Sequence, residues 1–141
     1  MTTGNHTTNV VKVIIEQTEN NYGAYVEGID GIVTVGNNID EIKTNIVEAI
    51  ELFIETSKEF GDEIPVELQG NYELVFKMDV QSMLNVYSKI FTKAGLERLT
   101  GINQKLLWHY ATGSKKPRAE QAMKLEHALH KLGAELLAIN L

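Results

Sequence analysis

The chain has 141 residues and a net charge of −6, with 13 Lys and Arg against 19 Asp and Glu. The sequence contains no cysteine, which excludes disulfide bridges, iron–sulfur clusters and thiolate zinc sites and fits a reducing compartment. No stretch approaches the roughly 20 apolar residues of a membrane-spanning helix, and the polar start of the chain does not have the pattern of a signal peptide. We therefore expect a cytoplasmic protein that does not bind a membrane.

Charge is divided unequally along the chain. Residues 1–80 hold 4 Lys against 15 Asp and Glu, a net charge of −11, whereas residues 81–141 hold 9 Lys and Arg against 4 Glu, a net charge of +5. An acidic half repels nucleic acid and suits a basic protein surface, while a basic half can neutralise phosphates. We therefore predict a disordered N-terminal arm, 1–9, followed by two domains, 10–80 and 81–141.

The acidic half is predicted to hold three strands, a helix and a fourth strand. Runs rich in β-branched and aromatic residues, separated by turn residues, predict strands at 10–16, 22–27, 32–35 and 72–79. Apolar residues at helical spacing predict one long helix from about Asn38 to Phe60, with Asn37 or Asn38 as its cap and Gly61 as its stop. This β-β-β-α-β order predicts an α+β domain whose helix packs on one face of a small sheet.

The candidate partner-binding residues of this half lie in and just after the second strand: Tyr22, Tyr25, Glu27 and Asp30. Tyr22 and Tyr25 fall on opposite faces of that strand, so one should be in the core and the other exposed. Glu16, Glu48 and Asp79 are the only set that suggests a metal-dependent nuclease, which needs three or four converging carboxylates. Such a trio arises easily by chance among so many acids, so we predict no catalytic residue, no metal and no cofactor, and no enzyme activity.

The basic half is predicted to be helical throughout. Thr92 caps a helix at 93–99, and Asn103 caps the next helix, which runs to about Thr112. Two short helices joined by a tight glycine turn form the unit that places its second helix in the major groove of DNA. The pattern therefore predicts an all-α helix-turn-helix domain.

The last part of the chain is predicted to be a further helix. Pro117 precedes this helix, Gly133 should end it, and the mostly apolar tail, 134–141, is expected to serve dimerisation or docking. Ile90 and Leu99 are among the apolar residues of this half that should face its core.

The run TGINQKLLWHYATGSKKP, residues 100–117, resembles the recognition-helix region of the Cro/phage-repressor helix-turn-helix family. This resemblance places Gln104, Lys105 and His109 where the family reads base edges, and these residue types suit that task. The other candidate DNA-binding residues, which would fix the register on the phosphates or cap the helix, are Lys93, Asn103, Ser114, Lys115 and Lys116.

Two residues of the basic half depart from that family pattern. Glu97 stands where the family has a small alanine at the crossing of the two helices. Trp108 lies on the side of the recognition helix that should be exposed. It could contact a sugar or a thymine methyl group, or it could be buried in a dimer or interdomain contact.

Residues 22–53 resemble the N-terminal domain of HicB-type antitoxins, which is a truncated relative of the ribonuclease H fold. Thr34-Val35-Gly36 and Glu48-Ala49-Ile50 match the pattern of that domain, whereas the loop at 29–32 departs from it. The two resemblances occur in the order found in HicB-type antitoxins. They imply a homodimer, or a higher even oligomer, that binds and neutralises a small basic mRNA-cleaving (HicA-type) toxin and represses its own operon by binding double-stranded operator DNA.

The alternative is a stand-alone transcriptional regulator, whose N-terminal domain senses a ligand or only oligomerises. The sequence argues against a ligand site only weakly, through the lack of a Gly-rich phosphate loop or a metal cluster.

Overall fold

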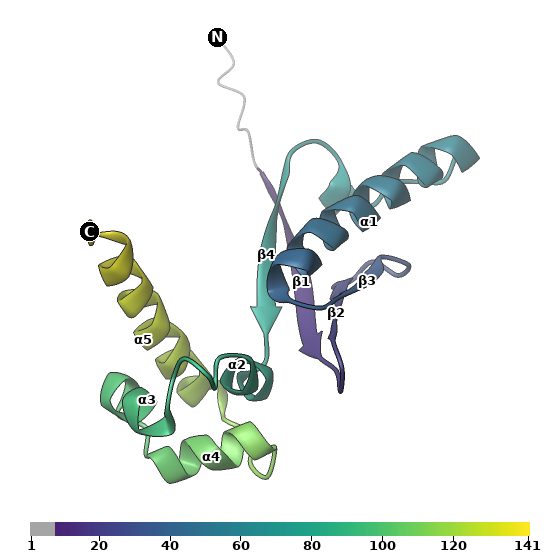
Figure 1. Cartoon of the computed structure of the whole chain (residues 1–141). Helices are drawn as coiled ribbons and strands as arrows, with labels where there is room; N and C mark the ends of the chain where they lie inside the picture. Colours follow the sequence, from purple (N-terminus) through teal and green to yellow (C-terminus); the bar gives the residue numbers. More distant parts are fainter. Residues whose placement is uncertain (1–7) are drawn as a thin grey trace. The chain divides into compact units, whose positions relative to one another are not determined.

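The computed structural model describes residues 8–141, and its architecture is α+β, as predicted (Figure 1). The chain forms two compact units, one that ends at Met78 and one that spans Asp79–Leu141. The first holds all the strands and one long helix, and the second holds four helices. Residues 1–7 of the expected N-terminal arm lie outside the described part of the chain.

The first strand begins one residue before the predicted position, because Asn9 is tied to a distant loop. Its side-chain amide donates hydrogen bonds to the carbonyl oxygens of Val66 and Gln69, at 3.1 and 3.0 Å. Asn9 therefore belongs to the sheet and not to the arm.

Four strands form one mixed sheet: β1 (Asn9–Gln17), β2 (Tyr22–Val26), β3 (Val33–Gly36) and β4 (Tyr72–Met78). Each lies within one residue of its predicted bounds. The order across the sheet is β3-β2-β1-β4, with β1 antiparallel to β2 and parallel to β4. In this register Val13 is opposite Val26 on one side and Phe76 on the other, so β1 is an interior strand of the sheet.

The long helix α1 (Ile39–Phe60) follows the edge strand β3, and the segment after the helix returns to the opposite edge of the sheet, where β4 begins (Figure 1). Both predicted end signals are confirmed: the side chain of Asn38 accepts the amide of Glu41 at 2.8 Å, and Gly61 has the left-handed φ of 69° that closes the helix. Three isoleucines spaced by four residues are fully buried against the sheet: Ile42, Ile46 and Ile50. A short 3₁₀ turn, η1 (Val66–Leu68), precedes β4.

The sheet face opposite α1 carries exposed side chains. Because side chains alternate along a strand, Val11, Val13 and Ile15 of β1 are buried on the α1 side while Val10 and Lys12 point the other way. The same holds on β3, where Val33 and Val35 are 69% and 61% exposed. We call this surface the open sheet face, and its large apolar members are Val10, Tyr25, Val33, Val35 and Val75.

The second unit consists of α2 (Val80–Val86), α3 (Lys93–Thr100), α4 (Gln104–Thr112) and α5 (Ala119–Leu137). Its core is a single cluster of buried residues: Leu84, Leu96, Ile102, Leu107, Tyr110, Ala111 and Leu125. A unit of this size buries a limited fraction of its surface, so each of these side chains carries a large share of its stability.

Three predictions for this unit are wrong. Ile90 is 72% exposed because α2 ends at Val86, so the helical periodicity that would turn Ile90 inward stops before it. Leu99 lies at the surface because Thr100 takes the inward position, where its hydroxyl donates to the carbonyl of Leu96 at 2.7 Å.

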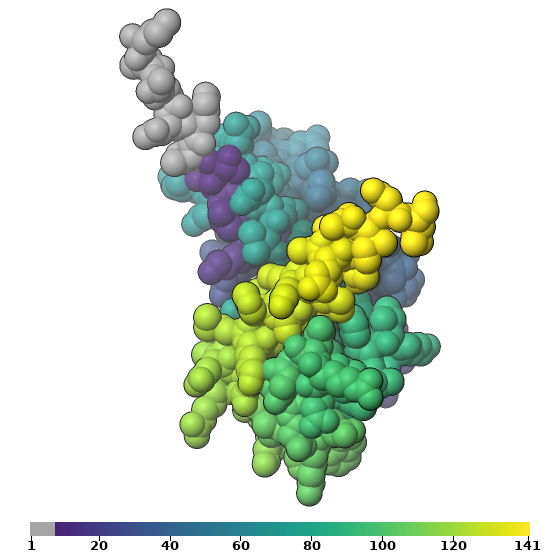
Figure 2. Space-filling view, turned by 90° about the vertical axis from the view of Figure 1, so that its left-hand side faces the viewer, coloured from purple at the N-terminus to yellow at the C-terminus, as the bar shows by residue number. Residues whose placement is uncertain are grey.

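Gly133 does not end α5, which continues to Leu137. Gly133 keeps a negative φ, and the residues that follow it, from Ala134 on, favour helix. Part of the predicted tail, at the yellow end of the chain in Figure 2, is therefore helix. Its leucines Leu136 and Leu137 are exposed.

Candidate nucleic-acid interface

A tight turn joins α3 to α4. The side chain of Thr92 caps α3 by accepting the amide of Gly95 at 3.0 Å, and Gly101 ends the helix with a φ of 75°. The hydroxyl of Thr100, which is buried, also accepts the amide of Ile102 at 3.1 Å. The turn is thus held by its own polar groups, and Ile102 is left to fill the core beneath it.

The inner side of α4 is anchored in the core of the unit. Leu107, Tyr110 and Ala111 are buried, and the side-chain amide of Asn85 on α2 donates to the carbonyl of Ala111 at 2.9 Å. The side chain of Asn103 caps the other end by accepting the amide of Lys105 at 2.8 Å. These contacts fix which side of α4 faces outward.

The outward side of α4 carries polar, cationic and aromatic side chains: Gln104, Lys105, Trp108 and Thr112. Two of the three predicted base-reading residues, Gln104 and Lys105, are therefore exposed together on one helix face. His109, the third, is half-buried at the margin of this face. The Nε2 group of Gln104 donates to a carboxylate oxygen of Glu97 on α3 at 3.2 Å, so the acid that departs from the family pattern holds a predicted base-reading side chain.

His109 also organises the loop that follows α4. Its carbonyl oxygen accepts hydrogen bonds from the amide of Lys115 at 3.2 Å and from the hydroxyls of Thr112 and Ser114 at 3.2 and 3.3 Å. Its ring Nδ1 lies 2.9 Å from the hydroxyl oxygen of Ser114. Because Nδ1 is engaged, Nε2 is the ring nitrogen left for a contact with a ligand.

The turn at the end of α4 requires glycine. Gly113 has a φ of 81°, and a Cβ at this position would come within 2.8 Å of the side-chain nitrogen of Gln81 on α2. Gly113 therefore lets the loop pass close to α2 and brings the exposed, cationic Lys115 and Lys116 next to the C-terminal end of α4. Lys93, another predicted phosphate contact, is the first residue of α3 and is half-buried.

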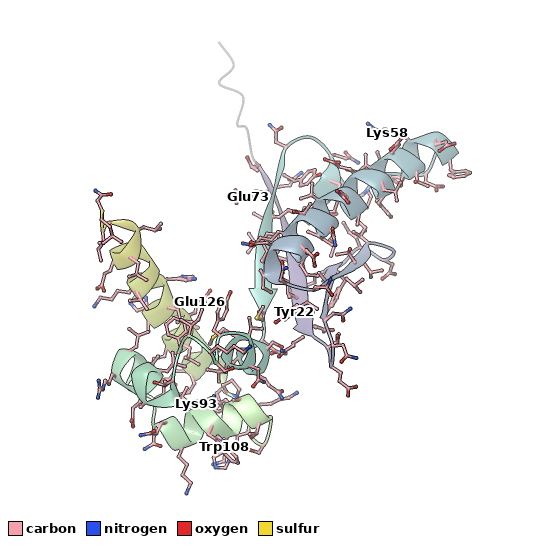
Figure 3. All side chains as sticks on the ribbon, in the orientation of Figure 1. Tyr22, Lys58, Glu73, Lys93, Trp108 and Glu126 are labelled. Carbon is pink, nitrogen blue, oxygen red and sulfur yellow. The ribbon has the colours of Figure 1, made fainter. Side chains whose placement is uncertain are left out.

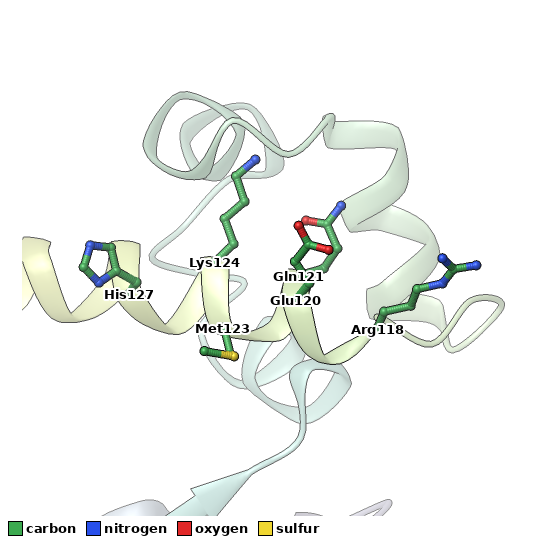
Figure 4. A pocket seen from close by; sticks show the side chains of 6 residues that line it. All are labelled: Arg118, Glu120, Gln121, Met123, Lys124 and His127. Atoms are coloured by element: carbon green, nitrogen blue, oxygen red, sulfur yellow. The ribbon is translucent and has the colours of Figure 1, made fainter.

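Two further cations lie near this surface that the sequence patterns did not single out. Arg118 is the residue before α5, and Lys124 lies one turn into it. The Lys124 ammonium nitrogen lies 3.7 Å from the position that a Cβ on Gly101 would occupy, so it reaches the turn between α3 and α4. Both side chains line a pocket along the first turns of α5 (Figure 4). In the sequence, only the position of Arg118 and Lys124 shortly after Lys115 and Lys116 could have indicated them.

The four predicted partner-binding residues of the first unit do not share one face. Tyr22 packs against the core on the α1 side, whereas Tyr25 is 38% exposed on the open sheet face, as the alternation of the strand predicted. Glu27 and Asp30 are exposed and lie in the loop after β2. Tyr25 is therefore the tyrosine available to a partner.

Within residues 8–141, no group of three or more acidic or histidine side chains is arranged to hold a metal ion. Asp79, one of the three acids considered for a nuclease site, caps α2 by accepting the amide of Ser82 at 2.6 Å. In the same described range no helix is both long enough and apolar enough to cross a bilayer.

No family model matches the chain, and neither a curated protein nor a solved structure matches it.

Proposed function

We propose that the chain is the antitoxin of a HicB-type toxin–antitoxin pair. Its second unit would bind operator DNA as a helix-turn-helix domain and repress the operon, and its first unit would bind and neutralise a small basic mRNA-cleaving toxin. The observation that carries this proposal is the outward face of α4, where Gln104 and Lys105 are exposed at the start of the helix and the cationic loop with Lys115 and Lys116 follows its end.

Three features support DNA binding by the second unit. The helix α4 is fixed from behind by the core, so its outer face is presented as a rigid surface that fits the major groove. Amide and ammonium groups on this face match the hydrogen-bonding groups of base edges. The lysines of the following loop supply charge for the phosphates, and the unit as a whole has an excess of cations.

The charges and apolar residues of the first unit support a basic protein partner. Six exposed acids lie along α1: Asp40, Glu41, Glu48, Glu51, Glu55 and Glu59. Acids in this number would speed the encounter with a cationic toxin. The apolar side chains of the open sheet face, such as Val33 and Val35, would supply the desolvated contact that a stable complex needs.

The DNA-binding part is tested by selecting binding sequences in vitro with the full chain. A repressor should recover a two-fold-symmetric sequence whose half-sites lie about 34 Å apart, because a dimer presents two recognition helices one DNA turn apart. Recovery of unrelated sequences, bound equally well, would leave only non-specific binding and contradict repression.

The toxin-binding part is tested by affinity capture from a lysate of the native host, with the full-length chain as bait. The expected result is one small basic protein, retained in stoichiometric amount, whose messenger cleavage stops when the chain is added. Specific operator binding without any such protein would favour the alternative, a stand-alone transcriptional regulator.

A further inference from the structure

Trp108 occupies the middle of the outward face of α4. Residues four apart lie above one another on a helix, so Gln104, Trp108 and Thr112 form one line along this face. Lys105 and His109 form the neighbouring line. Trp108 is 54% exposed and projects outward from the helix (Figure 3), so it stands between the side chains predicted to read bases.

The indole ring of Trp108 packs against a neighbouring aromatic ring. It meets the His109 ring edge to face, with centroids 5.2 Å apart and an interplanar angle of 72°. His109 in turn is positioned by the hydroxyl of Ser114, 2.9 Å from its Nδ1. A large apolar surface therefore stands in the middle of the outward face of α4.

The surroundings of Trp108 do not form an apolar patch of the kind that protein partners bury. Within α4, which lies wholly in the described part of the chain, Trp108 is the only large apolar side chain that is exposed. Its neighbours on the face are an amide, an ammonium and a hydroxyl group, and the loop beyond adds Lys115 and Lys116. This combination of one aromatic ring and several cations matches a polyanion better than the apolar centre of a protein interface.

Among the groups that base edges present in the major groove, one is apolar: the methyl group on C5 of a pyrimidine. Trp108 has no acceptor, and most of its exposed surface is apolar. We propose that Trp108 recognises this C5-methyl group next to the base contacted by Gln104, which makes it a specificity-determining residue. The inference rests on the DNA-binding function proposed above. Thymine carries this methyl group in any DNA, and 5-methylcytosine carries it in modified DNA.

The test removes the methyl group alone. The full chain is bound to its selected site, and each thymine is replaced in turn by deoxyuridine. We expect one position in each half-site to weaken binding about four-fold, the value of one buried methyl-sized group. In Trp108→Ala the same replacement should have no effect, and Trp108→Phe should keep part of it. Ile90→Ala, which removes an exposed apolar side chain outside α4, should behave like the wild type.

Two further measurements complete the test. Placing cytosine and then 5-methylcytosine at the sensitive position separates the methyl group from the rest of thymine, and methylation should restore affinity in the wild type but not in Trp108→Ala. Circular dichroism melts check that each variant folds. If deoxyuridine weakens wild type and Trp108→Ala equally, or weakens neither, the inference is wrong while DNA binding stands; if no sequence is selected at all, both proposals are wrong.

Discussion

Replacing Lys115 and Lys116 with alanine should flatten the salt dependence of DNA binding without changing the preferred sequence. Both lysines are exposed in a loop that His109 and Ser114 hold against the end of α4. Each ammonium that neutralises a phosphate contributes about 0.9 to the slope of log affinity against log salt concentration. Loss of both lysines should therefore reduce the magnitude of this slope by about 1.8. When the salt concentration is raised from 50 to 200 mM, the affinity of the variant should therefore fall about 12-fold less than the affinity of the wild type.

Fluorescence anisotropy titrations of the selected operator at four or five salt concentrations measure this slope directly. The matched control is Lys58→Ala with Lys77→Ala, which removes the same charge from exposed positions of the first unit and should leave the slope unchanged. An equal drop in slope for both pairs would mean that only net charge matters. An unchanged slope in the loop variant would remove Lys115 and Lys116 from the phosphate contacts.

Three further predictions concern stability and partner binding. Leu107→Ala should lower the free energy of unfolding of the second unit by about 2–5 kcal/mol, because this side chain is fully buried in a small core. Chemical denaturation monitored by Trp108 fluorescence measures this loss, and a value under about 1 kcal/mol would contradict the buried position of Leu107. Gly133→Ala should raise the stability of α5 by about 1 kcal/mol, since its backbone is helical and an added Cβ meets nothing within 4 Å; a lowered melting temperature would refute this. Val33→Thr combined with Val35→Thr keeps two strand-forming residues on β3 but should weaken capture of the basic partner at least ten-fold. Unchanged capture in a pull-down titration would exclude the open sheet face as the contact.

The elements that the sequence predicted well are those whose signals are local. Asn38 and Gly61 mark the ends of α1 by hydrogen bonds and backbone angles that involve only their neighbours, and Gly101 and Gly113 do the same for α3 and α4. Gly133 shows the limit of such signals, because a glycine stops a helix only if it adopts a positive φ, and here it does not.

The features that escaped prediction depend on residues far apart in the chain or on exact side-chain placement. The parallel pairing of β1 with β4 joins Val11 to Leu74, and periodicity along either strand does not encode its neighbour. At the candidate site, the types and spacing of Gln104 and Lys105 indicated the exposed face. The contact between Gln104 and Glu97 depends on how α3 and α4 cross, which a single sequence does not reveal.

That contact also determines how the amide of Gln104 is turned. A carboxylate only accepts hydrogen bonds, so the group 3.2 Å from the Glu97 oxygen must be the Gln104 NH₂, and the amide oxygen is left to point toward a ligand. In the DNA-binding role proposed above, a side chain presented in this way favours a base that offers a proton, such as the amino group of adenine or cytosine, over one that offers only acceptors. The amide nitrogen carries a second N–H, so the two-bond pairing of glutamine with adenine would use the N–H that Glu97 does not hold. Part of the base preference would then be set from α3, by a residue that never touches the DNA.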